Sequence, residues 1–292
     1  MPQRTLLAVY AHPDDEILGA GGALARYAAQ GVRVALVVAT RGEAGEIQRP
    51  GAATPETLPQ VREQEMRCSA KALGVSDLIF LNYRDSGMAG TPENEHPDAF
   101  VNAPAHEVVE RLVHIIRRLQ PQVVLTFEPY GGYGHPDHIA VNRYTLAAVD
   151  AAADAQRYQA QGPAWSTDRV YYPIVPDFVI EKIKARVAAR GGNVSGYDEL
   201  LEGRAANARQ LDDAISVQVD VAGFIDDKWR AWNCHRTQFG PDSRFRRLPD
   251  EEMKPILSTE YFVQARPQTA DPPQGQDLFA HTATGAPSSH SD

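Results

Sequence analysis

Short apolar runs alternate with longer helix-like segments through residues 1–175, and this alternation constrains the fold more than any other feature of the sequence. The first run, residues 5–11, has the continuous apolar pattern of a strand that is buried on both faces. Residues 16–30 have helical spacing, and residues 32–39 have the pattern of a second buried strand. The alternation predicts further strands at residues 78–82, 123–127 and 170–174, and further helices at residues 59–73, 105–119 and 138–153. Repeated strand–helix units predict an α/β fold of Rossmann-like type, with a mostly parallel sheet and helices on both of its faces.

The pattern becomes weaker after residue 175. It predicts, in order, a helix at residues 180–189, a break at Gly191-Gly192, a strand at residues 215–219 and a helix at residues 221–233. We interpret residues 1–175 as the core and residues 176–265 as a C-terminal elaboration, a subdomain or lid packed on that core. Residues 266–292 are rich in Pro, Ser, Thr, Gln and Gly and offer little to bury, so a largely disordered tail is expected.

The charge balance limits the kinds of molecule that this protein is expected to bind. Asp and Glu total 38 against 29 for Lys and Arg, a formal net charge of -9. An acidic chain is poorly suited to nucleic acid or to an anionic membrane surface, so we expect neither as a partner. A small-molecule enzyme fits better, and a homo-oligomer is neither indicated nor excluded.

The expected compartment is the cytoplasm. No apolar stretch approaches the roughly 18 residues of a membrane-spanning helix. Residues 1–4 lead directly into the first strand without the pattern of a secretory signal. Cys68 and Cys234 are the only cysteines and are not spaced as a CxxC pair, so we expect two buried, reduced thiols.

The first polar cluster, His12-Pro13-Asp14-Asp15-Glu16, follows the first predicted strand. Ligands of open α/β sheets bind outside the carboxyl ends of the strands. An imidazole and carboxylates on one turn are suitable ligands for a divalent ion, and a spare carboxylate can act as a base. Taken alone, the cluster is equally typical of a helix N-cap with acidic residues in the first turn.

A second cluster spans residues 128–138, directly after the strand predicted at residues 123–127. It contains Gly131, Gly132 and Gly134, followed by His135-Pro136-Asp137-His138. Alone, it could be a flexible glycine loop with two surface histidines. Both clusters contain His-Pro-Asp and both follow a strand, so together they favour one shared site over the simpler interpretations.

These two motifs resemble those of the LmbE-like or PIG-L zinc de-N-acetylases, which hydrolyse the N-acetyl group of N-acetylglucosaminyl conjugates. Gly19 and Gly21-Gly22 after the first motif also match the family. The resemblance extends over residues 5–265 and is strongest to members that act on N-acetylglucosaminyl inositol in the mycothiol pathway. The segments that carry this closer likeness are residues 40–46 (TRGEAGE), 84–91 (RDSGMAGT), 131–134 (GGYG) and 235–238 (HRTQ).

The resemblance implies a metal site and a set of catalytic groups. The implied metal ligands are His12, Asp15 and His138, with one coordination position left for water, and either zinc or ferrous iron suits two imidazoles and a carboxylate. Asp14 is the implied general base, which takes a proton from the attacking water. His135 is expected to stabilise the charged intermediate or to protonate the leaving amine.

Other roles follow from the same resemblance. Asp137 is expected to orient His135, and Tyr133 to polarise the amide carbonyl. The implied substrate-binding residues are Arg62, Asp85, Glu46 and His235. From the sequence alone, Arg62 could also belong to a solvated charged face of a helix. His235 follows a predicted helix and could close over the site or have a structural role.

The expected function is therefore zinc-dependent removal of acetate from an N-acetylglucosaminyl small-molecule conjugate. The aglycone could be inositol or malate, both used in low-molecular-weight thiol biosynthesis, or the substrate could be that of a mycothiol S-conjugate amidase. A metal-dependent phosphoesterase is a second hypothesis, although the motifs supply ligands for one metal and no cradle of Arg or Lys for phosphate. A non-catalytic sugar-binding protein is a third, but such a protein has no use for Asp14.

Overall fold

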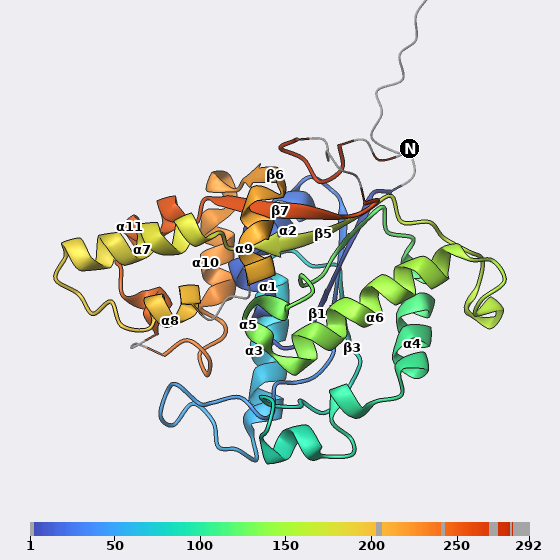
Figure 1. Ribbon diagram of the computed structural model, residues 1–292, viewed down its shortest axis with the longest axis horizontal. Helices are drawn as coiled ribbons and strands as arrows, with labels where there is room; N and C mark the ends of the chain where they lie inside the picture. Colours follow the sequence, from blue (N-terminus) through green and yellow to red (C-terminus); the bar gives the residue numbers. More distant parts are fainter. Residues whose placement is uncertain (1–2, 203–205, 241–242, 269–273, 281, 283–292) are drawn as a thin grey trace, which may run out of the picture.

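A seven-stranded sheet in the order β3-β2-β1-β4-β5-β7-β6 forms the centre of the protein (Figure 1). This computed structural model describes residues 3–202, 206–240, 243–268, 274–280 and 282. The strands are β1 (Thr5–Tyr10), β2 (Arg33–Val38), β3 (Asp77–Phe80), β4 (Val123–Leu125), β5 (Arg169–Ile174), β6 (Ile215–Asp220) and β7 (Thr259–Arg266). The first five strands pair in parallel, and β7 pairs antiparallel with β5 and β6. The predicted α/β fold with a mostly parallel sheet is confirmed.

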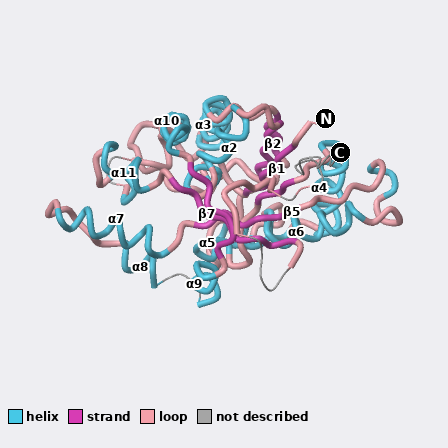
Figure 2. The backbone as a smooth tube through the Cα atoms, turned by 90° about the horizontal axis from the view of Figure 1, so that it is seen from above, coloured by secondary structure: helices cyan, strands magenta, loops and turns pink. Residues whose placement is uncertain are grey.

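Helices cover both faces of the sheet (Figure 2). The helices are α1 (Asp15–Leu18), α2 (Gly21–Ala29), α3 (Leu58–Ala72), α4 (Ala105–Leu119), α5 (Gly131–Gly134), α6 (Pro136–Ala153), α7 (Asp177–Ala189), α8 (Tyr197–Glu202), α9 (Ala206–Asp213), α10 (Ile225–Trp232) and α11 (Asp250–Ile256). Short 3-10 helices are η1 (Pro92–Glu95), η2 (Phe100–Asn102), η3 (Gln159–Gln161), η4 (Ala222–Phe224) and η5 (Arg244–Arg246). Helices α4 and α6 pack together on one face, and α2, α3 and α10 pack on the other.

Strand β1 lies between β2 and β4 and contributes to both cores. Its side chains alternate between the two faces, as the pleat of a strand requires. Leu6 and Ala8 belong to the core under α2 and α3, while Leu7 and Val9 belong to the core under α4 and α6. All four are at most 1% exposed, so the prediction of a strand buried on both faces is confirmed.

The helix predicted at residues 16–30 is in fact two helices, α1 and α2, separated at Gly19 and Ala20. The break frees the first N–H groups of α2 for a distant carboxylate. Gly22 N and Ala23 N donate to Glu260 of β7 at 2.8 and 2.7 Å, and Lys228 Nζ lies 2.7 Å from the same carboxylate. Helix N-termini favour such negative charge. Local spacing contains no sign of a partner more than 200 residues away, so the sequence predicted one continuous helix.

The C-terminal elaboration extends the core sheet. Strand β7, which the sequence analysis did not predict, inserts between β5 and β6. Part of the expected disordered tail also packs on the core, because Leu278 and Phe279 are buried and Tyr27 donates its hydroxyl hydrogen to Asp277 at 2.8 Å. For residues 274–280 the prediction of disorder is therefore wrong. Residues 269–273, 281 and 283–292 lie outside the described part of the chain.

The two cysteines form a disulfide, so the expectation of two buried, reduced thiols is wrong. Cys68 lies on α3 and Cys234 follows the end of α10, and these two helices pack against each other. Cys68 is exposed and Cys234 is half-buried. The cysteines are 166 residues apart, so only the packing of the helices brings them together.

None of the helices in the described residues combines the length and the apolarity that a bilayer span requires.

Replacing Arg117 of α4 with methionine is expected to reduce the free energy of unfolding by at least about 3 kcal/mol, because hydrogen bonds from a charged donor contribute ~1.5–3 kcal/mol each. The guanidinium is buried and donates to the last turn of α6 and to the loop that follows it. Its acceptors are the carbonyl oxygens of Ala151, Ala152, Asp154, Arg157, Tyr158 and Gly162. Urea denaturation measures the change. Arg118→Met, at the exposed neighbouring position, is the control and should shift stability by no more than about 0.5 kcal/mol. Equal effects of both substitutions would contradict the prediction.

Candidate active site

The two His-Pro-Asp motifs meet at the carboxyl ends of β1 and β4. These strands are neighbours in the sheet, and the chain continues from β1 to β2 on one side and from β4 to β5 on the other. Such a reversal of strand order creates a crevice in which α/β proteins bind ligands. His12 follows β1, and His138 lies in the first turn of α6, after β4.

Three electron-pair donors converge there. His12 Nδ1 lies 3.2 Å from His138 Nε2. Asp15 Oδ1 lies 3.3 Å from His138 Nε2, and Asp15 Oδ2 lies 3.6 Å from His12 Nδ1. All three side chains are at least nine-tenths buried. The structure thus brings together the three residues that the sequence analysis assigned as metal ligands.

The hydrogen-bond partners determine which ring nitrogens carry hydrogen. His138 Nδ1 lies 3.0 Å from the carbonyl oxygen of Gly131, which can only accept, so Nδ1 is protonated and Nε2 has a lone pair. His12 Nε2 faces Asp137 Oδ2 at 3.1 Å and Asp85 Oδ1 at 3.4 Å, so its lone pair is on Nδ1. When His12 and His138 are both neutral, these two lone pairs point at each other beside a carboxylate. A cation between them removes this repulsion, so the donor set fits a divalent metal.

The described residues also contain two overlapping groups of potential metal ligands, His12–His135–His138 and His12–Asp85–Asp137. The second group uses His12 Nε2, which is already directed at two carboxylates. A metal-bound imidazole usually donates its other ring N–H to a carboxylate, which fixes the orientation of the ring. We therefore interpret Asp85 and Asp137 as supports of His12.

The electrostatics of the site favour positive charge. Burial of His12 disfavours its charged form, but the carboxylates of Asp85 and Asp137 outweigh burial and raise the pKa of this imidazole well above its usual value. Burial would raise the pKa of Asp15, but the imidazoles of His138 and His12 lower it well below its usual value. A divalent ion experiences the same field.

Asp14 occupies a strained position at the start of α1. Its φ is 109° and its ψ is -21°, a conformation that is unfavourable for a residue with a Cβ and that recurs at functional sites. Its backbone N–H donates to Glu16 Oε2 at 2.9 Å, and its Oδ2 lies 3.3 Å from Arg62 Nη2. Burial, opposed by the Arg62 guanidinium and assisted by the Asp15 carboxylate, raises the pKa of Asp14 to about 6. A carboxylate with a pKa near neutrality is suited to accept and release protons.

Arg62 lies under this turn. Its side chain is 4% exposed, which excludes a solvated helix face. Nη2 donates to the carbonyl oxygen of Pro13 at 2.6 Å, and Nη1 donates to that of Gly42 at 2.8 Å. A Cβ at Gly42 would lie 2.1 Å from Nη1, so this position of the TRGEAGE segment requires glycine.

The glycine-rich loop after β4 packs tightly against His138. Gly131 has a φ of 72°, and a Cβ there would lie 2.5 Å from His138 Cβ. The Phe127 ring stacks on the His138 ring at a centroid distance of 4.0 Å. Glu128, which the sequence analysis did not single out, is buried and accepts from Tyr130 N and Gly132 N at 2.6 and 2.5 Å. The loop is therefore internally bonded and fixes the ring of a candidate ligand.

His135 is the N-cap residue of α6, and its Nδ1 accepts from Asp137 N at 3.2 Å. Its ring hydrogen is therefore on Nε2. Burial, with the imidazoles of His12 and His138, lowers the pKa of His135 to about 4. Tyr133 is 53% exposed, with its ring 6.0 Å from that of His135.

Asp137 was expected to orient His135, and the structure shows that the group in contact with the His135 ring is the backbone amide of Asp137, not its carboxylate. The carboxylate binds His12 and accepts from Ser86 N at 3.0 Å, and only the backbone amide of Asp137 reaches the His135 ring. The first turn of α6 is the reason, because it directs these adjacent side chains to different neighbours.

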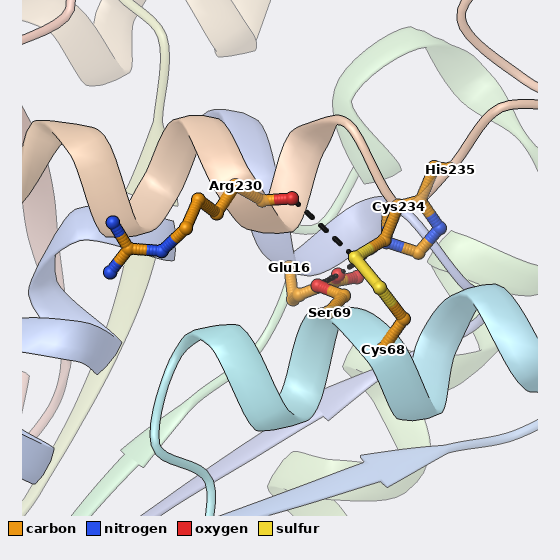
Figure 3. Close-up of a disulfide and its surroundings, with 6 residues drawn as sticks. All are labelled: Glu16, Cys68, Ser69, Arg230, Cys234 and His235. Atoms are coloured by element: carbon orange, nitrogen blue, oxygen red, sulfur yellow. Dashed lines mark hydrogen bonds and ion pairs between the residues drawn. A yellow bond between two sulfur atoms is a disulfide. The ribbon is translucent and has the colours of Figure 1, made fainter.

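The other expected substrate-binding residues lie in different surroundings. Asp85 is buried and accepts from Gly87 N and Ala44 N. Glu46 is exposed. His235 is 0% exposed, which favours the structural role over closure of the site. Its Nε2 lies 2.7 Å from Glu16 Oε1 (Figure 3). The other oxygen of Glu16 accepts from Asp14 N.

Glu16 is a further residue whose importance the sequence analysis missed. Its Oε1 accepts from the Ser69 hydroxyl at 2.5 Å and faces His235, while its Oε2 accepts from Asp14 N. The motif contains Glu16, but its acidic position in a helix first turn is explained by capping alone. Its distant partners lie on α3 and in the segment after α10, so they could not be inferred from local sequence.

This fold and site define a PIG-L protein. Residues 7–149 match the model of the PIG-L family, described as GlcNAc-PI de-N-acetylase. A relative from Geodermatophilus obscurus is 39% identical over 290 residues, which cover 96% of this chain and 98% of the relative. The chain belongs to the PIG-L de-N-acetylase family. That relative is a 1D-myo-inositol 2-acetamido-2-deoxy-alpha-D-glucopyranoside deacetylase by name.

Solved structures support the fold assignment. The N,N'-diacetylchitobiose deacetylase of Pyrococcus horikoshii is similar with a TM-score of 0.61 and 21% identity, over 90% of this chain and 84% of that chain. The 4-carboxy-2-hydroxymuconate hydratase GalB of Pseudomonas putida has a TM-score of 0.59 and 19% identity, over 92% and 99% of the two chains. Because a hydratase shares the fold, the reaction must be argued from the site.

Proposed function

We propose that this protein removes the N-acetyl group of a 2-acetamido-2-deoxyglucoside linked to inositol, in a metal-dependent reaction. The observation that carries the proposal is the convergence of His12 Nδ1, His138 Nε2 and the Asp15 carboxylate beside Asp14. The names of the relatives support the choice of inositol as the aglycone.

We propose zinc as the resident metal, with ferrous iron as the alternative that the same donor set accommodates. His12, Asp15 and His138 would hold it. A divalent ion there supplies Lewis acidity and makes water a nucleophile at neutral pH.

The protein's own groups then move the protons. Asp14 accepts a proton from the water that attacks the amide carbon. His135 directs its Nε2 hydrogen at the negative charge that develops on the former carbonyl oxygen, and Tyr133 polarises that carbonyl. When the C–N bond breaks, the leaving amine takes up the proton that Asp14 accepted from the water.

The remaining residues position these groups or bind the sugar. Arg62 holds the Asp14 turn through the Pro13 carbonyl, and its location also suits an interaction with a sugar hydroxyl. Asp85 is proposed to orient His12 in place of binding substrate, since backbone amides and His12 already engage its carboxylate. Glu46 is exposed and stays a candidate for the aglycone.

Acetate release from three substrates tests the function: N-acetylglucosaminyl inositol, N-acetylglucosaminyl malate and free N-acetylglucosamine. The inositol conjugate should give the highest kcat/KM. A preference for malate would overturn the assigned aglycone, and the absence of acetate release with metal-loaded protein would overturn the deacetylase. Phosphate release from phosphorylated sugars would favour a phosphoesterase instead.

We also propose that the protein acts in the cytoplasm on this small molecule, without nucleic acid or membrane as a partner. The net charge of -9 supports the choice of partner. In a cytoplasm the Cys68–Cys234 disulfide would be exposed to reductants, and cytoplasmic disulfides are usually transient or redox-sensing. Cell fractionation with an antibody against the chain tests the compartment.

A further inference from the structure

A pocket of about 460 Å³ opens directly onto the Cys68–Cys234 disulfide. Both cysteines line it, together with Arg49, Arg236 and Glu65. The candidate metal ligands do not line it, so this pocket is separate from the site described above. Access is greatest at Cys68, which is exposed, while Cys234 is half-buried.

The charges around this pocket favour an anion. Among the described residues, neither Arg49 nor Arg236 takes part in an ion pair. The carboxylate of Glu65 is already engaged, because it accepts from Thr237 N at 2.8 Å and from Thr237 Oγ1 at 2.6 Å. Two guanidinium groups beside an accessible disulfide raise the local concentration of anions, including thiolates.

We propose that this pocket is a thiol–disulfide exchange site that takes a small anionic thiol. The thiolate attacks Cys68 Sγ, the S–S bond breaks, and Cys234 leaves as a thiolate that takes up a proton. A second thiolate attacks the small-molecule sulfur of the mixed disulfide, which releases Cys68 and forms the small-molecule disulfide. Two thiols thus supply two electrons and two protons to the protein, and the reverse reaction restores the Cys68–Cys234 bond. The Arg230 carbonyl, 3.4 Å from Cys234 Sγ, is an acceptor ready for the new thiol hydrogen.

The disulfide is also adjacent to the groups that support Asp14 (Figure 3). Ser69 follows Cys68, and His235 follows Cys234, and both contact Glu16 Oε1. The other oxygen of Glu16 accepts from Asp14 N at 2.9 Å. Reduction unlinks the two backbones that hold Glu16, so the exchange would loosen the Asp14 turn. This coupling rests on the proposed function, whereas the exchange itself does not.

Three thiols of similar size and different charge test the exchange: 2-mercaptoethanesulfonate, 2-mercaptoethanol and cysteamine. The full-length oxidised protein is reacted with each, and alkylation followed by mass spectrometry gives the rate of reduction. Each rate is divided by that for bis(2-hydroxyethyl) disulfide, which removes differences in thiol reactivity. The anionic thiol should react at least about 10-fold faster than the cationic one at low salt, and the difference should shrink in 0.5 M salt.

The double variant Arg49→Gln, Arg236→Gln should lose most of the preference for the anionic thiol over the cationic one. Arg118→Gln, Arg143→Gln is the matched control, because it removes two exposed guanidinium groups from α4 and α6 on the other face of the sheet. The proposal is overturned if the three normalised rates are equal in the wild type, or if both double variants change them equally. These measurements need no deacetylase activity, so they separate failure of this proposal from failure of the proposed function.

Acetate release from oxidised and reduced protein tests the coupling to Glu16. Reduction should lower kcat at least about threefold while KM changes less than about twofold, because small displacements of a catalytic group cost rate more than affinity. Cys68→Ser, Cys234→Ser should match the reduced protein and be insensitive to thiols. Thermal unfolding verifies that this variant is folded, and an equal kcat of the oxidised and reduced forms overturns the coupling.

Discussion

Replacing Asp15 with alanine is expected to remove the bound metal and with it all measurable deacetylation. Asp15 supplies the carboxylate that lies 3.3 Å from His138 Nε2 and 3.6 Å from His12 Nδ1. Without it, two neutral imidazoles would have to hold a divalent ion with no negative charge between them. The loss of metal affinity should exceed the roughly 10–100-fold that removal of a supporting hydrogen bond costs. Metal analysis after dialysis against a weak chelator measures it.

Three further variants make this test specific. Asp15→Asn keeps the acceptor for His12 N, which now donates to Asp15 Oδ2 at 2.7 Å, and should lose metal although the turn stays intact. Asp137→Asn removes the negative charge that supports His12 and should cost only about 10–100-fold in metal affinity. His135→Ala should keep the metal and lose rate. Wild-type metal content in Asp15→Ala, or equal metal loss in Asp15→Ala and His135→Ala, would contradict the assigned roles.

Replacing Asp14 with asparagine is expected to lower kcat by about 10²–10⁴ and to leave the metal in place. Asp14 is the carboxylate next to the proposed ligand Asp15, and its Oδ2 lies 3.3 Å from Arg62 Nη2. Asparagine is the suitable substitution because it tolerates the positive φ of 109° better than alanine does. The amide keeps the shape of the side chain but cannot take a proton. Acetate release at saturating substrate, with metal content measured in parallel, checks the result.

Asp14→Ala serves as the second variant, and its unfolding curve shows how much of any loss comes from the strained turn. If Asp14→Asn retained full activity with metal bound, the general base would have to be another group. If Asp14→Asn lost the metal, as Asp15→Ala is expected to do, Asp14 would be a metal ligand and not the general base.

The parts of the site that the sequence predicted well are those in which a short motif follows a buried strand. His12 and His138 belong to two such motifs, and the parallel arrangement of β1 and β4 places their carboxyl ends at the same edge of the sheet. The apolar runs that form these strands have no helical period, so their assignment was straightforward. The convergence of His12, Asp15 and His138 follows from that arrangement, and their role as metal ligands stays a prediction.

The parts that could not be predicted depend on contacts between distant segments. His235 was a candidate to close over the site and is instead buried, because the packing of α10 on α3 directs its ring toward Glu16. Asp137 was expected to orient His135, and its carboxylate instead contacts His12, a residue 125 positions earlier. The break between α1 and α2 is explained by the carboxylate of Glu260 and could not be inferred from residues 16–30 alone.

By itself, the sequence determined the α/β class, the edge of the sheet that carries the site, and the His, Asp and Gly residues that form it. These features depend on local periodicity and on the fixed geometry of parallel strands. Only the tertiary structure decided the hydrogen-bond partners behind those residues: which nitrogen of His12 has a free lone pair, what holds Asp14 in its turn, and that Cys68 and Cys234 are joined. Most of these contacts join segments that are far apart in the chain, so they are specified by packing and not by any local spacing.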